Sequence, residues 1–438
     1  MATTLRAGVA RRDITPPLGV PLFGYPNPQR VAESVRDGLN VTVLVLEQDQ
    51  VRAAIVSCDL CLPDDDTVAQ IRAGVSQKTG IPPLHITVSY TQTHSGPSTQ
   101  TAWGWSDRND TYLAMMTSRA IEAVVDAWNA RQPVRVGIAA TSSDVGVNRR
   151  EIGENHQVGL GVNPWGLYDP TMTVLRFVTL ADQSLATIIH YGAHPTVLDG
   201  STRAVSRDWP GVMVDRVEHF SKAPAIFING AVGDIAPRSN TLRAVGDGEI
   251  ALQEVGTRAA MDAMRAFRQI KDFRDLGLAV HTGTFTMPYR PIAPLDEAVR
   301  KVAEYESKKE VYGTPRCEFL HWSAVVKAHE QGGGADGKRF DQTITSLGPV
   351  AIVAFPGEVF AETVMRLRKS SPFEYTLSAS TTNGSNGYFP TRDSLHRGGY
   401  EVWVAKAFGP SILVENIDDV LFEENLKLLR EAWARRSR

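Results

Sequence analysis

The feature that most constrains this chain is Thr91–Pro97, where a histidine-bearing turn directly follows a short apolar segment. That segment, His85–Tyr90, has the length and the β-branched content of a buried strand. Ser95-Gly96-Pro97 then marks a turn. His94 is therefore predicted at the carboxyl end of a strand, where open α/β sheets bind their ligands. A single histidine in such a place is more often a hydrogen-bonded structural residue.

A second histidine occupies a matching position. The strand-like segment Leu185–Tyr191 is followed by Gly192-Ala193-His194-Pro195, and two such strand ends predict two imidazoles in one cleft. Glu358 follows the apolar segment Val350–Phe355 after a Pro-Gly turn. Two imidazoles and a carboxylate are a common ligand set for catalytic zinc, although Glu358 alone also fits a first-turn helix carboxylate. The chain has no HExxH pair, so the spacing by itself is a weak signal.

Strand-like and helix-like segments alternate along the whole chain. Asn40–Glu47 and Arg52–Asp59 predict a hairpin, and Asp64-Asp65-Asp66 predicts the start of a helix. The Gly- and Asn-rich segment 148–166 lacks periodicity and is expected to be a loop. The pattern predicts an α/β fold in which a large mixed central β-sheet is flanked by helices, in a single domain spanning residues 1–438.

Composition excludes several classes of function. The chain has 42% hydrophobic and 22% charged residues and a net charge of −3, which does not fit a nucleic-acid-binding surface. No segment approaches the roughly 18 apolar residues of a membrane span, and the first residues do not resemble a secretory signal. We therefore expect a cytoplasmic protein that acts on a small-molecule substrate away from membranes. Nothing in the sequence indicates the oligomeric state.

The cysteines do not form a metal or redox motif of their own. Cys58-Asp59-Leu60-Cys61 has CxxC spacing, but a zinc knuckle needs a second pair and only Cys317 is left. Because Cys58 ends an apolar segment, a buried thiol at a strand end is the favoured interpretation over a redox pair.

From about residue 8 to residue 413, a series of short motifs resembles the neutral (alkaline, non-lysosomal) ceramidase family. The most specific is Thr93-His94-Ser95-Gly96-Pro97. Others occur in the order of the family: Gly8–Thr15, Ser57–Leu60, His194-Pro195-Thr196, Gly233–Pro237, Pro356-Gly357-Glu358, Gly387-Tyr388 and Gly399-Tyr400-Glu401.

The resemblance implies a zinc-dependent hydrolase that cleaves an amide by means of metal-activated water. It assigns zinc to His94, His194, Glu358 and Tyr388. It also implies that Arg149 lines the substrate site. We expect Arg149 or Tyr388 to stabilise the developing oxyanion, which makes both candidate catalytic residues.

Three positions depart from the family pattern. Ala236 stands where the family has an active-site serine, Gln92 replaces the first histidine of its THTHSGP signature, and Ser385 replaces a loop tyrosine. Gln92 is expected to contact the substrate. The C-terminal β-sandwich of the family is expected to be absent.

These departures argue against long-chain ceramide as the substrate, and without a hydroxyl at position 236 no acyl-enzyme is expected. Two alternatives stay open: a zinc-dependent esterase or lactonase, and a catalytically inactive metal-binding homologue. Retention of all four implied zinc ligands favours an enzyme.

Overall fold

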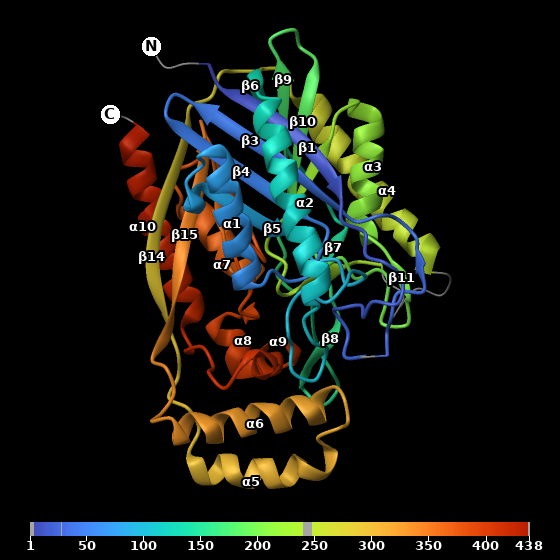
Figure 1. Ribbon diagram of the computed structural model, residues 1–438, viewed down its shortest axis with the longest axis vertical. Coiled ribbons are helices and arrows are strands. Elements are labelled where there is room, and N and C mark those ends of the chain that lie inside the picture. Colours follow the sequence, from blue (N-terminus) through green and yellow to red (C-terminus); the bar gives the residue numbers. More distant parts are fainter. Residues whose placement is uncertain (1–3, 28, 240–247, 437–438) are drawn as a thin grey trace.

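A computed structural model describes residues 4–27, 29–239 and 248–436, and an eight-stranded mixed sheet lies at its centre (Figure 1). In spatial order the strands are β12 (Ala225–Asn229), β10 (Ser184–Tyr191), β9 (Thr171–Thr179), β6 (Gln132–Ser142), β1 (Arg6–Asp13), β3 (Asn40–Gln48), β4 (Val51–Cys58) and β5 (Ile86–Tyr90). The two outer pairs, β12–β10 and β4–β5, are parallel, and the inner neighbours are antiparallel. The predicted mixed central sheet and the β3–β4 hairpin are confirmed.

A second sheet packs against one face of the first. It contains β14 (Leu278–Pro288), β15 (Gly337–Leu347), β16 (Val350–Ala354) and β18 (Tyr375–Ala379). Leu44 and Ile55 of the large sheet share a buried apolar cluster with Leu347 and Ile352 of the small one. Burial on both faces explains why these strands read as continuous apolar segments rather than alternating ones.

Helices cover the two outer faces of this sheet pair (Figure 1). They are α1 (Asp65–Thr79) and α2 (Asp110–Asn129) over β1 and β3–β5, α3 (Asp208–Ser221) and α4 (Gly248–Gln269) over β9, β10 and β12, and α7 (Ala361–Ser370) and α10 (Ile417–Arg436) over the small sheet. The start of α1 agrees with the acidic signal in the sequence, because the Asp64 side chain accepts a hydrogen bond from the Thr67 backbone N–H. Among the described residues, no helix is long and apolar enough to cross a lipid bilayer.

The expectation of a loop over residues 148–166 is wrong. Residues 148–163 of this segment belong to a hairpin of β7 (Gly146–Ile152) and β8 (Val158–Asn163), and β7 also pairs with β13 (Ile235–Pro237). The hairpin is held partly by polar contacts, such as those from Asn148 Nδ2 to the Leu167 carbonyl and to Asp234. Such a strand carries no apolar alternation, so its sequence resembles that of a loop.

A helical pair is inserted between the neighbouring strands β14 and β15. Helices α5 (Leu295–Tyr305) and α6 (Thr314–Glu330) lie together at the lower end of the molecule in Figure 1. The remaining short elements are β2 (Ser34–Val35), β11 (Ala204–Val205), β17 (Glu358–Val359), β19 (Tyr388–Phe389), α8 (Arg392–Arg397), α9 (Tyr400–Trp403), η1 (Pro83–His85), η2 (Glu306–Lys308) and η3 (Val404–Phe408).

Candidate active site

The two histidines identified at strand ends lie close together. His94 follows β5 and His194 follows β10, and their ring centroids are 5.7 Å apart. Asn229, the last residue of β12, joins the strand ends by donating from Nδ2 to the Thr91 carbonyl at 3.0 Å. The two imidazoles therefore belong to one site, as the sequence pattern predicted.

His194 is held in one tautomer by the backbone. Its Nδ1 lies 3.0 Å from the Ile235 carbonyl oxygen, which can only accept, so Nδ1 carries the proton and Nε2 carries a lone pair. The Trp209 indole N–H also donates to the His194 carbonyl at 3.0 Å, which fixes the backbone at this point. The Nε2 atom is directed at the Glu358 carboxylate, 3.0 Å from Oε2.

Glu358 and Tyr388 are brought side by side by strand register. They are direct partners in the short parallel pair β17–β19, although 30 residues separate them in the chain (388 − 358). The Tyr388 hydroxyl lies 3.5 Å from His194 Nε2. Together with His94, both residues line a small pocket of about 30 Å³, and His194 contacts both of them. The four residues implied as metal ligands thus meet at one place.

The contact between His194 and Glu358 leaves two electron-rich atoms facing each other. Apart from this contact, Glu358 Oε2 is buried and has no hydrogen-bond partner among the described residues. Buried lone pairs of this kind are normally satisfied by a proton donor or a cation, so the donor set fits a metal ion here. In the part of the chain that the structure describes, no group of three or more His, Cys, Asp and Glu side chains is arranged to hold a metal ion, so His94, His194 and Glu358 lie near one another without forming a closed ligand set.

Burial keeps the imidazoles neutral. It lowers the pKa of His94 well below 6.5, and the nearby His194 and Arg149 lower it further. Burial also lowers the pKa of His194, an effect that Arg149 reinforces and Glu358 opposes. Neutral imidazole is the form that binds metal. Burial raises the pKa of Tyr388 well above 10, with Glu358 adding to the shift and Arg149 opposing it.

Arg149 projects from β7 toward this site. Its guanidinium carbon lies 5.4 Å from the centroid of the Tyr388 ring, and its Nη2 is buried without a hydrogen-bond partner among the described residues. Glu401 accepts from Arg149 Nε at 2.9 Å and from Arg150 Nη1 at 2.6 Å, and its side chain is only 1% exposed. Arg149 is therefore positioned with one N–H group available to an anionic ligand.

Glu401 was not among the site residues predicted from the sequence. Its only sequence signal was the Gly399-Tyr400-Glu401 motif, which gave no role for the carboxylate. Burial lowers the pKa of Arg149, but Tyr388, Glu401 and Glu358 outweigh burial, so the pKa of this guanidinium is raised and it stays charged.

Gln92 and Ala236 occupy the margin of the site. Gln92 is fully buried, has a positive φ of 72° and places Nε2 3.3 Å from His194 Nε2. Its Oε1 atom has no partner among the described residues. Ala236 lies on β13 next to Ile235, the residue whose carbonyl orients His194, and it offers no functional group. Gln92 thus contacts His194 directly, whereas Ala236 contributes only packing.

The remaining walls of the small pocket are mainly apolar and aromatic, and they include Phe23, Leu62, Trp105, Tyr400 and Phe408. Such walls lower the local dielectric and strengthen the electrostatic interactions of the polar groups that they enclose.

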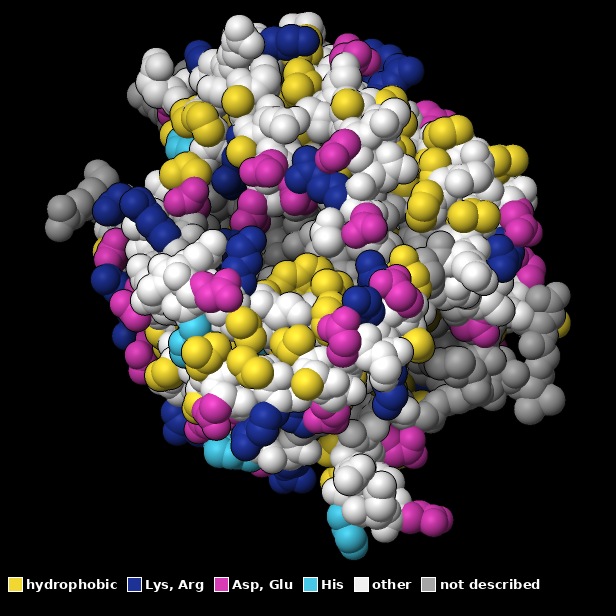
Figure 2. All heavy atoms as spheres, turned by 60° about the horizontal axis from the view of Figure 1, so that its bottom comes forward, with side chains coloured by type: hydrophobic (Ala, Val, Ile, Leu, Met, Phe, Trp, Pro, Cys, Tyr) yellow, Lys and Arg dark blue, Asp and Glu magenta, His cyan; other side chains and the backbone are white. Residues whose placement is uncertain are grey.

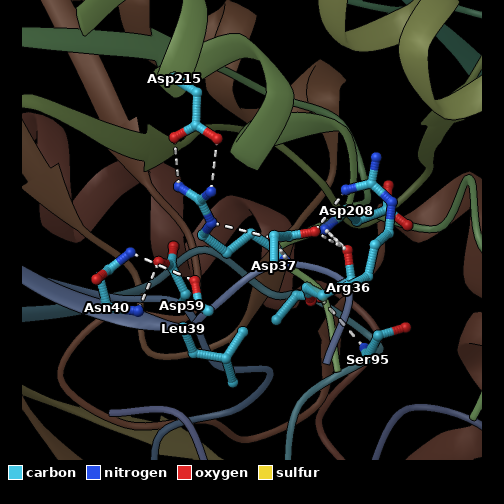
Figure 3. Close-up of polar contacts among 12 residues, drawn as sticks. Arg36, Asp37, Leu39, Asn40, Asp59, Ser95, Asp208 and Asp215 are labelled. Atoms are coloured by element: carbon cyan, nitrogen blue, oxygen red, sulfur yellow. Dashed lines mark hydrogen bonds and ion pairs between the residues drawn. The ribbon is translucent and has the colours of Figure 1, made fainter. Parts of the chain in front are cut away.

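A polar network supports the His94 loop from outside (Figure 3). Asp37 accepts a hydrogen bond from the Ser206 hydroxyl at 2.7 Å. The Ser206 backbone N–H donates to the Ser95 carbonyl at 3.0 Å, and Thr93 Oγ1 donates to the Ser206 carbonyl at 2.6 Å. These contacts fix the backbone on both sides of His94.

Comparisons with known proteins give one family match and similar solved structures. Residues 5–251 match the family model for the N-terminal part of neutral/alkaline non-lysosomal ceramidases. The structure is similar to that of neutral ceramidase from Pseudomonas aeruginosa, with a TM-score of 0.76 and 17% identity over 99% of this chain and 75% of that chain. It is also similar to a structure described as ceramidase complexed with C2, with a TM-score of 0.76 and 16% identity over 99% of this chain and 76% of that one. No curated protein matches the sequence.

Proposed function

Because the chain belongs to the neutral/alkaline non-lysosomal ceramidase family, we propose that it is a zinc-dependent hydrolase that cleaves an amide bond. The observation that carries the zinc assignment is the contact of His194 Nε2 with Glu358 Oε2 at 3.0 Å, with no hydrogen available between the two atoms. His94 and Tyr388 meet this pair at the same pocket.

In this proposal His94, His194, Glu358 and Tyr388 hold the metal. When bound, zinc supplies Lewis-acid polarisation of the scissile carbonyl and lowers the pKa of coordinated water. The two imidazoles are already neutral and need lose no proton on binding, whereas the raised pKa of Tyr388 means that its hydroxyl is protonated before the metal arrives.

The other groups act on the substrate. Arg149 Nη2, buried and free of partners among the described residues, would donate to the developing oxyanion, a role commonly worth about 3–4 kcal/mol. Glu401 is a positioning residue, since it orients that guanidinium through Nε. Gln92 would contact the substrate through its unpartnered Oε1. Ala236 has no hydroxyl, so water rather than a side chain attacks the carbonyl.

The volume of the pocket bears on the substrate. About 30 Å³ beside Glu358 and Tyr388 holds only a small group next to the reacting carbonyl. Together with the departures from the family pattern at Gln92, Ala236 and Ser385, this volume favours a substrate other than long-chain ceramide.

The test combines metal content with turnover. We expect the purified protein to contain about one zinc per chain by mass spectrometry, and His94→Ala or His194→Ala to lose most of it. His190→Ala is the matched control, because His190 is a buried histidine on β10 whose ring contacts the Ser378 carbonyl instead of the site.

A panel of short-chain amides, esters and lactones then defines the reaction. We expect amide hydrolysis that stops on chelation and returns with zinc. Turnover of esters or lactones alone would replace the amidase assignment with an esterase or lactonase. Bound zinc without any turnover would favour the inactive homologue, and full zinc content in the double histidine variant would refute the ligand set.

A further inference from the structure

A larger pocket adjoins the small one at its Phe408 wall. It has a volume of about 320 Å³, within the usual range of small-molecule sites, and Phe408 lines both pockets. Its lining includes the first turn of α1 and the loop that leads to Tyr388. We call it the acidic pocket, and its polar lining residues are Asp64, Asp65, Asp66, Gln100, Tyr289, Lys338, Ser385, Asn386 and Ser411.

Negative charge exceeds positive charge at this pocket. Arg108 Nη1 lies 2.6 Å from Asp64 Oδ1 and 3.6 Å from Asp66 Oδ2, and Arg108 Nε lies 2.7 Å from Asp110 Oδ1. Asp65 lies 2.6 Å from Lys338. Four carboxylates thus share two cations, which leaves a formal charge of −2.

Lys338, the basic residue in the lining, already has two hydrogen-bond partners. Lys338 Nζ donates to Asp65 Oδ2 at 2.6 Å and to Asn386 Oδ1 at 2.7 Å. A ligand anion would have to displace these bonds while approaching three aspartates. A ligand cation would instead meet aspartate carboxylates whose negative charge is only partly neutralised by Arg108 and Lys338.

Two buried polar atoms point independently to a ligand. Ser385 is 4% exposed, and its hydroxyl has no hydrogen-bond partner within residues 4–27, 29–239 and 248–436. Gln100 Oε1 is likewise buried and has no hydrogen-bond partner among these residues, whereas Gln100 Nε2 donates to the Ser385 carbonyl at 3.2 Å. Unsatisfied buried acceptors are rare in folded proteins, and both residues line the acidic pocket.

We propose that the acidic pocket binds an ammonium group carried by the substrate. The substrate is then an amide whose amine part bears a second, protonated nitrogen. Its carbonyl lies at Glu358 and Tyr388, and the chain passes Phe408 to reach the aspartates. This inference rests on the proposed function, because it places the reacting carbonyl in the small pocket.

Figure 2, in which the lower end of Figure 1 is turned forward, shows a hollow near the middle of the face that is bordered by both charged and hydrophobic side chains.

Binding of matched, uncharged and charged probes tests the inference without turnover. The probes are mono-acetylated 1,4-diaminobutane, N-butylacetamide and N-acetylated 4-aminobutanoic acid, which share a four-carbon chain on the amide nitrogen and differ in the charge at its end. By calorimetry on the full chain, we expect the ammonium probe to bind about three to ten times more tightly than the neutral one. The carboxylate probe should bind most weakly, and high salt should reduce the differences.

Two variants are expected to act in opposite directions. Asp65→Asn should weaken binding of the ammonium probe, and Lys338→Met should strengthen it, each by a factor of about three to ten. The exposed residues Glu254 and Lys427 supply charge-matched controls, and neither Glu254→Gln nor Lys427→Met should change the affinity. Neither effect should appear with N-butylacetamide.

The outcomes separate this inference from the proposed function. Equal or weaker binding of the ammonium probe, or no gain with Lys338→Met, would overturn the acidic pocket even if short amides are hydrolysed. Charge-selective binding in a protein that hydrolyses no amide would support the pocket and refute the amidase assignment.

Discussion

Replacing Glu401 by glutamine is expected to destabilise the protein substantially, because it removes the only carboxylate between two buried guanidinium groups in the described contacts. Arg149, Arg150 and Glu401 have side chains that are 8%, 9% and 1% exposed. Removing one partner of such a buried pair costs about 3–5 kcal/mol, since the charges left behind cannot be solvated. For 438 residues the unfolding entropy is about 0.9 kcal/mol/K, so the melting temperature should fall by about 3–5 °C.

The effect should depend on pH in a defined direction. Burial raises the pKa of Glu401, but Arg149 and Arg150 outweigh it and hold the pKa below 4.5. A carboxyl with a depressed folded-state pKa contributes stability above its unfolded pKa and loses it as pH falls through the folded value. The difference between wild type and Glu401→Gln should therefore be constant from about pH 5 to pH 8 and shrink only in more acidic solution.

Scanning calorimetry at several pH values measures this, with Glu254→Gln as an exposed control. Arg150→Gln and the double variant complete a cycle, and the double variant should cost less than the sum of the two single variants. In Glu401→Gln and in the double variant kcat should fall more than KM rises, because Arg149 loses the Glu401 contact that orients it toward Tyr388. A melting temperature within 1 °C of wild type, or additive single effects, would refute the argument that Glu401 neutralises both arginines.

Three further predictions concern the site itself. Gly24→Ala places a Cβ 2.5 Å from His94 Cγ at a φ of +106°, whereas Gly19→Ala has a similar φ of +86° and nothing within 4 Å. Both variants should lose about 1–2 kcal/mol of stability. Only Gly24→Ala should lower the rate of hydrolysis and the zinc content, by about tenfold. If Gly24→Ala and Gly19→Ala lost the same fraction of activity, His94 would be excluded from the site. Arg149→Lys should lower kcat about 100-fold with little change in KM, because lysine cannot keep both the Glu401 contact and a second donor, and an unchanged kcat would remove Arg149 from catalysis. Finally, mass spectrometry during turnover should detect no acyl adduct, since Ala236 cannot carry one, and a stable adduct on any residue would contradict direct attack by water.

Local sequence patterns were sufficient for several parts of the site. His94 and His194 could be placed at strand ends because each follows a short apolar segment and precedes a proline-marked turn. The β3–β4 hairpin and the start of α1 were predicted for the same reason, since turn residues and helix caps act within a few positions. The polar β7–β8 hairpin was missed because its contacts are hydrogen bonds that leave no hydrophobic period.

By itself, the sequence determined the central mixed sheet, the two strand-end histidines and the motif order that identifies the family. The tertiary structure alone decided that the apolar strands form two stacked sheets and that Glu358 and Tyr388 share a register. It also decided that Glu401 holds Arg149 across 252 residues of chain and that Asp65 meets Lys338 at the acidic pocket. The physical reason is the distance along the chain over which each interaction acts. Turns, helix caps and hydrophobic periodicity depend on residues that are neighbours in sequence, whereas strand register and buried ion pairs form only when packing brings distant segments together.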